Sequence, residues 1–279
     1  EPRLPGGAVE WVRRAEGLRS RGEAWALLHR EYPRLVAVPP PPDRSAAPED
    51  FCRPPPGLEA AWGTGSAWEA EALAFLERQW GLGLEDARLW GLGRCRRGRY
   101  AWRVVVPVVM GGRLVSFLAR TVRGAEPRYL NARCGPPSDP AAECGRPAAA
   151  QLFNLDAARE GCIVVLVEGA GDAIALCRAQ RAAADHPVPV ALLGQALTPQ
   201  KLALLRAARP RRVVVALDVG EAEARRARDH VADLLAWDVP AVVGVWRGAK
   251  DAGAGAILDV AADSSGLLGR VAGRLGVKV

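Results

Sequence analysis

Apolar residues recur at helical spacing in several segments of the first hundred residues. Two short helices are expected within residues 8–30, with a break at Gly17. A longer helix is predicted to begin at Ser66 and end at Gly81, and a short one follows at 84–89. The first part of the chain is therefore expected to be partly helical.

Two β-rich runs in the middle of the chain predict a hairpin. Residues 100–109 and 113–122 are rich in β-branched and apolar residues, and Met110-Gly111-Gly112 separates them. Strand-like runs joined by a short glycine-containing turn are typical of a β-hairpin. Residues 132–149 then form a Pro/Gly-rich loop, and a short helix is expected at 152–160.

From Cys162 onwards, apolar runs alternate regularly with helix-like segments. The strand-like runs are IVVLVEG, VPVALLG, RRVVVALD and VPAVVGVWR, and the helix-like segments are 172–184, 198–209, 221–237 and 254–263. Thr198 and Pro199 provide an N-cap and a proline at the first position of one of these helices. The predicted fold class is therefore α/β, a mostly parallel sheet flanked by helices, preceded by a smaller α+β unit with the hairpin.

Prolines cluster between the first helices and the rest of the chain. Pro39 to Pro42 and Pro54 to Pro56 lie within residues 36–57. This composition is typical of an extended linker, so the segment is the predicted boundary between residues 1–35 and the main folded part.

Carboxylates fall at the predicted ends of three strands of the α/β unit. Glu168 ends the first strand, and Asp172 follows at the start of a helix. Asp218 ends the third strand, and Asp251 follows the fourth. Because ligands gather beyond the carboxyl ends of strands in such sheets, these side chains are expected to converge. Carboxylates suit Mg²⁺, which offsets phosphate charge when a phosphodiester forms or breaks.

Each carboxylate also has a purely structural interpretation. Asp172 could cap its helix and interact with the helix dipole, and Asp218 could be a turn residue. Asp251 could pair with Lys250 in solvent. The convergence of three strand ends on one edge of the sheet favours the metal site.

The same residues carry a resemblance to a known family. VEGAGDAIAL (167–176) resembles the Toprim signature, in which a strand ends in Glu-Gly and an Asp opens the next helix. ALDVGEAEARRA (216–227) is similar to its second motif, Asp-x-Asp before a helix. AKDAG (249–253) resembles its Lys-Asp element.

The region upstream resembles the DnaG-type primases of bacteria and phages. WRVVVPVVMGGRLVSFLARTVRGAEPRYLN (102–131) is similar to the hairpin region before Toprim, and AAAQLFNLDAARE (148–160) to the helix that leads into it. Residues 6–28 resemble the end of the zinc ribbon that precedes the polymerase domain in these primases.

The resemblance implies a division into five parts. These are a helical remnant after a zinc-ribbon position at 1–35, the linker at 36–57, an N-terminal α+β primase subdomain at 58–161, a Toprim domain at 162–263 and a C-terminal tail at 264–279.

The resemblance also implies a site. Its catalytic residues would be Glu168, Asp218 and Asp251, and its ligands to Mg²⁺ or Mn²⁺ would be Glu168, Asp172, Asp218, Glu221 and Asp251. The chain departs from the family where the second aspartate of Asp-x-Asp is Gly220 and a later glycine is Glu223. Glycine offers no ligand, so Glu221 or Glu223 would have to substitute. The zinc-ribbon ligands are absent from this sequence, and no zinc is expected.

Basic residues concentrate around the hairpin, at Arg113, Arg120, Arg123, Arg128 and Arg133. By resemblance, Arg120 and Arg128 match positions that hold nucleotide or template phosphates, and a guanidinium suits phosphate oxygens. The expected nucleic-acid or nucleotide contacts are Arg113, Arg120, Arg128, Tyr129, Asn131 and Lys250. A solvated hairpin face is the alternative for the arginines. The run Arg94, Arg96, Arg97 and Arg99 is either a second phosphate-contacting loop or a soluble turn.

The composition of the chain bears on its partners and its location. The net charge of +7 favours phosphate polymers as partners, although arginine richness also fits a GC-rich genome. No apolar run is long enough for a membrane span and no signal peptide is evident, so a cytoplasmic protein is expected.

The six cysteines form no C-x-x-C pair. Scattered reduced thiols are favoured over a metal site that includes Cys134 and Cys144.

The resemblance and the departure from it imply two possible functions, which belong to different classes. The first is a primase, which uses Mg²⁺ to join ribonucleoside triphosphates on single-stranded DNA and could work with a replicative helicase. The second, favoured by Gly220, is a degenerate primase-like module that binds nucleic acid or nucleotides within a replication complex. A Toprim nuclease or topoisomerase fits less well, because the three tyrosines, Tyr32, Tyr100 and Tyr129, offer no clear nucleophile.

Overall fold

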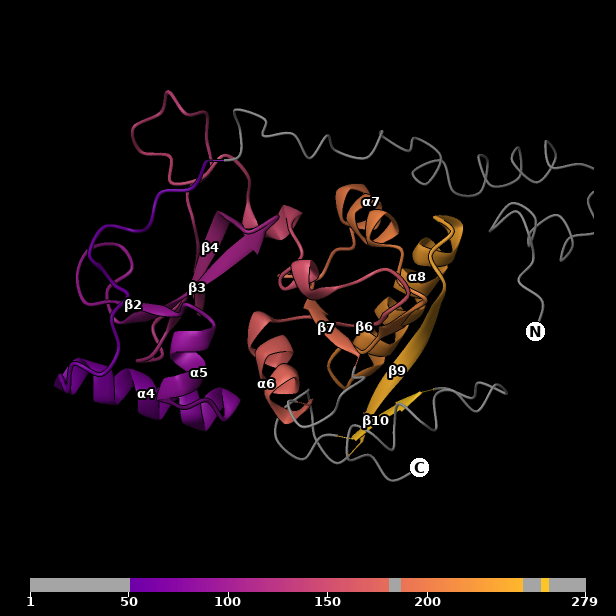
Figure 1. Ribbon diagram of the computed structural model, residues 1–279, viewed down its shortest axis with the longest axis horizontal. Coiled ribbons are helices and arrows are strands. Elements are labelled where there is room, and N and C mark those ends of the chain that lie inside the picture. The colour runs from indigo at the N-terminus through magenta and orange to yellow at the C-terminus, as the bar shows by residue number, and fades with distance from the viewer. Residues whose placement is uncertain (1–50, 181–186, 248–256, 261–279) are drawn as a thin grey trace, which may run out of the picture.

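A computed structural model describes residues 51–180, 187–247 and 257–260 (Figure 1). The helices expected within residues 8–30, most of the proline-rich linker and the tail at 264–279 lie outside the described residues. Lys250 and Asp251 lie outside them as well. The five-part division of the chain stays a prediction.

The two helices predicted before the hairpin are confirmed. Helix α4 (Ala67–Trp80) begins after Ser66, whose hydroxyl accepts a hydrogen bond from the Glu69 backbone N–H. It ends at Gly81, which adopts a left-handed conformation with φ 66°. Helix α5 (Leu84–Leu89) follows at the predicted residues.

The predicted hairpin lies at the centre of the first sheet. Its strands are β1 (Leu58–Glu59), β2 (Gly93–Cys95), β3 (Arg103–Met110), β4 (Arg113–Thr121) and β5 (Tyr129–Asn131), in that order and all antiparallel. Gly111 and Gly112 form the turn between β3 and β4 with φ values of 59° and 72°, a region that disfavours side chains. Strand β3 starts later than residue 100, because Trp102 has a φ of 59° and belongs to a turn.

The predicted helix at 152–160 is wrong. This region holds only the short 3-10 turns η1 (Ala148–Ala150) and η2 (Leu155–Ala157). Phe153 exchanges backbone hydrogen bonds with Ala191 of the second sheet, and Asn154 has a φ of 65°. Residues in these conformations cannot continue a helix, so a contact distant in sequence overrides the local pattern.

The second sheet confirms the predicted α/β fold class. Its strands are β6 (Ile163–Val167), β7 (Val188–Ala191), β8 (Arg212–Val215), β9 (Ala241–Arg247) and β10 (Ile257–Val260), in the order β10-β9-β8-β6-β7. Its helices are α6 (Ala170–Gln180), α7 (Pro199–Ala208) and α8 (Glu221–Ala236). The pairs among β6 to β9 are parallel and β10 is antiparallel to β9. The helix expected at 254–263 is therefore wrong for residues 257–260, which pair with the edge of β9 instead.

Helices cover both faces of the second sheet (Figure 1). Val165 and Val167 of β6 face a core that includes α6, α4 and the hairpin strands. Val164 and Leu166 face the other way, into a core built with α7 and α8. Continuous apolar strands buried on both faces are what the sequence pattern predicted.

The first sheet and the second sheet share a hydrophobic core. Helix α4 packs against α6, where Gly171 lies directly against the indole of Trp80. This shared core fixes the hairpin and its arginines relative to the strand ends of the second sheet. None of the helices in the described part of the chain has the length and apolarity that a membrane crossing requires.

Candidate functional site

Glu168 and Asp218 meet at the carboxyl ends of neighbouring strands. Glu168 follows β6, Asp218 lies just beyond β8, and these two strands pair in parallel. The Asp218 backbone N–H donates a hydrogen bond to the Glu168 carboxylate. Burial raises the pKa of Glu168, and the negative charge of Asp218 raises it further, while Arg226 lowers it. The structure thus brings together the two acids that the strand pattern predicted.

Arg226 of helix α8 also lies at this site, although the sequence pattern did not predict it. Its Nη1 lies 3.3 Å from Glu168 Oε1, and its Nη2 lies 3.7 Å from Glu223 Oε1. All three side chains are partly buried. The i,i+3 spacing of Glu223 and Arg226 on a predicted helix was visible in the sequence, but the contact with Glu168 depends on tertiary structure.

The other predicted acids have different surroundings. Asp172 Oδ2 accepts a hydrogen bond from the Gly169 backbone N–H at 3.0 Å, so Asp172 does cap the start of α6. Glu221 is exposed on the first turn of α8.

Arg120 and Tyr129 form the basic and aromatic side of the site. They are directly paired residues of β4 and β5, and the Arg120 guanidinium lies 4.8 Å from the centroid of the Tyr129 ring. Burial raises the pKa of the Tyr129 hydroxyl, Arg120 lowers it and the negative charge of Asp172 raises it. An effect of Asp172 on Tyr129 means that this pair lies close to the acidic end of the second sheet.

The remaining predicted contacts are spread along the hairpin. Arg113 begins β4 and Arg120 lies near its other end, about 23 Å away along an extended strand. Arg128 and Asn131 are exposed beside Tyr129. The structure therefore groups Arg120, Arg128, Tyr129 and Asn131 and leaves Arg113 apart.

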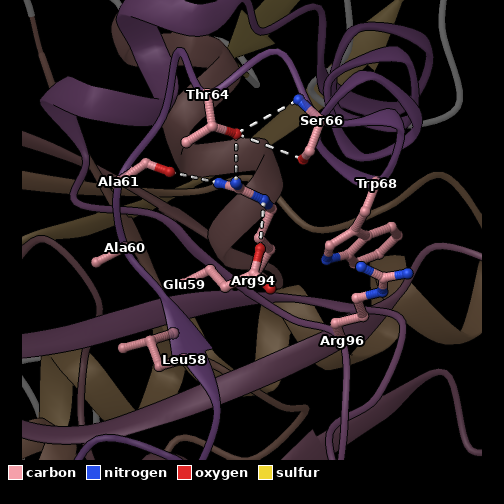
Figure 2. A pocket seen from close by; sticks show the side chains of 9 residues that line it. All are labelled: Leu58, Glu59, Ala60, Ala61, Thr64, Ser66, Trp68, Arg94 and Arg96. Carbon is pink, nitrogen blue, oxygen red and sulfur yellow. Dashed lines mark hydrogen bonds and ion pairs between the residues drawn. The ribbon is translucent and has the colours of Figure 1, made fainter.

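The basic run near residue 94 is divided by the fold (Figure 2). Arg94 is buried and lies 3.2 Å from carboxylate oxygens of both Glu59 and Glu69. It also donates hydrogen bonds to the Ala61 carbonyl and the Thr64 hydroxyl, beside a cavity of about 430 Å³. Arg94 thus holds the loop before α4 and is not a phosphate contact, whereas the arginines that follow it are exposed: Arg96, Arg97 and Arg99.

Three of the cysteines are neighbours, so the expectation that the thiols are scattered is wrong for Cys52, Cys134 and Cys144. Cys134 Sγ lies 2.9 Å from Cys144 Sγ, and Cys52 forms a backbone bridge with Cys144. Burial raises the pKa of Cys52 and of Cys134 to about 12, and Cys144 contributes to both shifts. Thiols held in the protonated form are poor nucleophiles.

The acids at the strand ends can be tested for their fit to a divalent cation. In residues 51–180, 187–247 and 257–260, no group of three or more His, Cys, Asp or Glu side chains is arranged to hold a metal by itself. Mg²⁺, however, is usually held by one or two carboxylates together with water and substrate phosphates. Glu168 and Asp218, which are close enough for one charge to perturb the other, fit that requirement.

Comparison with known proteins gives a consistent family resemblance. A DNA primase of Synechococcus elongatus is 36% identical over 158 residues, which cover 54% of this chain and 21% of that protein. The chain therefore spans about a fifth of the length of this curated relative. Profiles of protein families gave no match.

Solved structures show the fold. A DnaG primase catalytic domain bound to single-stranded DNA superimposes with a TM-score of 0.55 and 20% identity, covering 67% of each chain. The Escherichia coli primase catalytic core gives a TM-score of 0.52 at 20% identity, covering 67% of this chain and 68% of that one. The primase fragment of the bacteriophage T7 primase-helicase gives 0.50 at 15% identity, covering 83% and 80%. The chain thus has the fold of a DnaG-type primase catalytic core and shares sequence with a DNA primase, in agreement with the family that its motifs resemble.

Proposed function

We propose that this chain is the catalytic core of a DNA primase, which joins ribonucleotides into short RNA primers on single-stranded DNA. The meeting of Glu168 and Asp218 at adjacent strand ends of a primase-type fold carries this proposal. Sequence similarity to a DNA primase supports it. We assign the catalytic roles to Glu168, Asp218 and Asp251.

The basic and aromatic side chains around the hairpin are proposed to bind the triphosphate and the template. Arg120 and Arg128 would contact phosphates, and Tyr129, which is 39% exposed, could stack on a base. Arg113, Asn131 and Lys250 are the further proposed contacts. Arg113 and Asn131 lie on the neighbouring strands β4 and β5, and such a spread suits an extended single strand better than a compact ligand.

Mg²⁺ or Mn²⁺ is the proposed cofactor, and when bound it would offset the negative charge of the reacting phosphates. Glu168 and Asp218 are its proposed ligands, supported by Asp172 and Asp251 and by Glu221 or Glu223 in place of the residue at 220. Arg226 balances part of the acidic charge through its contact with Glu168. This chain's own side chains thus hold the site together and position the phosphates.

A degenerate binding module is the alternative function. Gly220 lacks a carboxylate, and Arg226 pairs with an acid that the enzyme needs. Such a module would bind single-stranded DNA or nucleotides within a replication complex without synthesis. A replicative helicase is a proposed partner in either case, since the similar phage T7 fragment derives from a primase-helicase.

Ribonucleotide incorporation on single-stranded DNA separates the two functions. The wild-type chain is expected to incorporate ribonucleotides with Mg²⁺ or Mn²⁺, and Glu168→Gln is expected to lose that activity while still binding DNA. Glu77→Gln, an exposed charge-matched change on α4, is the control. DNA binding without incorporation by the wild type would favour the binding module.

A further inference from the structure

Three cysteines from three separate segments lie side by side against the first sheet. Cys144 pairs with Cys134 in a parallel bridge and with Cys52 in an antiparallel bridge, so it is the middle residue of the three. Directly paired residues of neighbouring strands project their side chains from the same face. The sulfurs of Cys134 and Cys144 accordingly lie 2.9 Å apart. Cys144 is buried, whereas Cys134 is exposed and open to a reagent in solution.

The backbone holds Cys134 and Cys144 at a separation that suits a disulfide. The Cys144 N–H donates to the Arg133 carbonyl at 3.0 Å, and the Gly135 N–H donates to the Cys144 carbonyl at 3.1 Å. Neighbouring strands lie about 4.8 Å apart, and a disulfide joins α-carbons that are roughly 4.4–6.8 Å apart. A bond between the two sulfurs would therefore need small side-chain rotations and not a shift of the backbone.

We propose that Cys134 and Cys144 are an oxidisable pair, which a low-molecular-weight disulfide converts into a protein disulfide. The thiolate of the exposed Cys134 attacks the small disulfide, forms a mixed disulfide and releases one small thiol. The Cys144 thiolate then attacks the Cys134 sulfur and displaces the second small thiol. Two protein thiols are oxidised, one small disulfide is reduced, and the two thiol protons pass to the released thiolates. This inference goes beyond the proposed function and does not rest on it.

The surroundings of the pair make its oxidation slow and selective. Burial raises the pKa of Cys134 to about 12, and Cys144, Cys52 and Glu143 add to the shift. Thiolate is therefore scarce at neutral pH, and the exchange becomes faster as pH rises. The short contact with Cys134 selects it as the partner of Cys144, while Cys52 keeps its thiol. A reducing compartment would keep the pair as thiols until such an oxidant accumulates.

The new bond would brace the segments around Cys144. Cys134 and Cys144 are ten positions apart, so the disulfide closes a short loop after β5. Segment 51–53 is tied to the same place, because the Arg53 N–H donates to the Glu143 carbonyl and the Gly145 N–H to the Phe51 carbonyl. Closing a loop restricts the unfolded chain more than the folded one, so the oxidised chain should melt at a higher temperature.

Peptide mapping of the whole chain after incubation with oxidised glutathione tests the proposal. Free thiols are blocked first, and the chain is then digested with trypsin. Cys134 and Cys144 share one tryptic peptide, residues 134–159, which should lack two hydrogen atoms and carry no blocking group. The Tm should rise with this change, and dithiothreitol should reverse both effects.

Two variants make the test specific. Cys134→Ser changes an exposed residue and should form no internal disulfide and show no rise in Tm with the oxidant. Cys177→Ser removes a partly buried cysteine of α6 and should still form the bond, as the control for the loss of one thiol.

Three results would overturn the proposal. The first is glutathione that stays on Cys134 without an internal bond, since Cys144 would then not be able to attack. The second is a bond from Cys144 to Cys52 in the wild type. The third is a full set of six free thiols after incubation with the oxidant at alkaline pH. None of these results would bear on the proposed primase activity.

Discussion

The Arg120 guanidinium lies over the ring of Tyr129, at paired positions of β4 and β5. Among the described residues, Arg120 Nε is buried without a hydrogen-bond partner. Tyr129 in turn is close enough to Asp172 for that charge to raise its pKa. The pair therefore connects the basic hairpin to the acidic end of the second sheet, where a nucleic acid would meet the proposed catalytic residues.

Replacing Arg120 with alanine is expected to weaken binding to single-stranded DNA. Loss of one phosphate contact should also reduce the slope of log K against log salt by about one. Fluorescence anisotropy over a range of salt concentrations measures both quantities, with Arg78→Ala on α4 as the exposed control. An unchanged slope for Arg120→Ala would remove Arg120 from the phosphate contacts.

Replacing Tyr129 with leucine tests base stacking separately from charge. The variant is expected to bind single-stranded DNA more weakly by about 1–3 kcal/mol, with an unchanged salt slope. Tyr129→Phe keeps the ring and should bind like the wild type. Equal binding by the leucine and wild-type chains would show that Tyr129 contacts no base.

Gly171 is expected to be essential for the packing of α4 on α6. A β-carbon at this position would overlap the Trp80 indole nitrogen and lie 2.6 Å from its Cδ1. Gly171→Ala should lower the free energy of unfolding by about 1–3 kcal/mol, because a rigid ring cannot yield easily. Urea unfolding measures the loss, and adding Trp80→Leu should recover most of it. Independent, additive effects of the two changes would contradict this contact.

Asp233 on α8 makes stability depend on pH. Burial raises its pKa from 3.8 to about 6, and Asp229, four residues earlier, adds to the shift. The folded state therefore binds the carboxyl proton of Asp233 more tightly than the unfolded state does. This difference stabilises the folded state fully below pH 3.8, and the stabilisation is lost as pH rises through about 6. Asp233→Asn should raise the Tm near neutral pH and lose that advantage below pH 3.8.

Thermal unfolding at the two pH values provides the measurement for Asp233. Asp229→Asn removes only the repulsion between the two carboxylates, which is the smaller cause of the raised pKa of Asp233. This variant should therefore raise the Tm at neutral pH less than Asp233→Asn does. A neutral-pH Tm of Asp233→Asn at or below that of the wild type is the contrary result.

Arg94 is expected to act in folding rather than in DNA binding. Its guanidinium contacts Glu59, Glu69, Ala61 and Thr64 at once, a geometry that lysine cannot reproduce. Arg94→Lys should therefore lower the Tm clearly although it keeps the charge, whereas Arg97→Lys at an exposed position should not. Differential scanning calorimetry of the two variants checks this, and equal melting temperatures would argue against the buried role.

Local patterns predicted much of the fold. Ser66 and Gly81 bound helix α4 through their own capping chemistry, and Gly111 and Gly112 set the hairpin turn. The helix expected at 152–160 failed because Phe153 pairs with Ala191, a residue of a distant strand. Residues 257–260 form a strand for the same reason, since the edge of β9 pairs with them.

The candidate site was only partly predictable. The strand pattern predicted that Glu168 and Asp218 would meet, because parallel strands end at one edge of the sheet. It could not predict that Arg226 reaches Glu168 from a helix. Nor could it distinguish the buried Arg94 from its exposed neighbours, because its burial depends on Glu59 and Glu69.

The most direct test of the central claim is the product formed from ribonucleoside triphosphates on unprimed single-stranded DNA. We predict that the wild-type chain, supplied with Mg²⁺ or Mn²⁺, makes short alkali-labile strands complementary to the template. Glu168→Gln should make none. A wild-type chain that binds the same template and yields no such strands would contradict the assignment of primer synthesis to this chain.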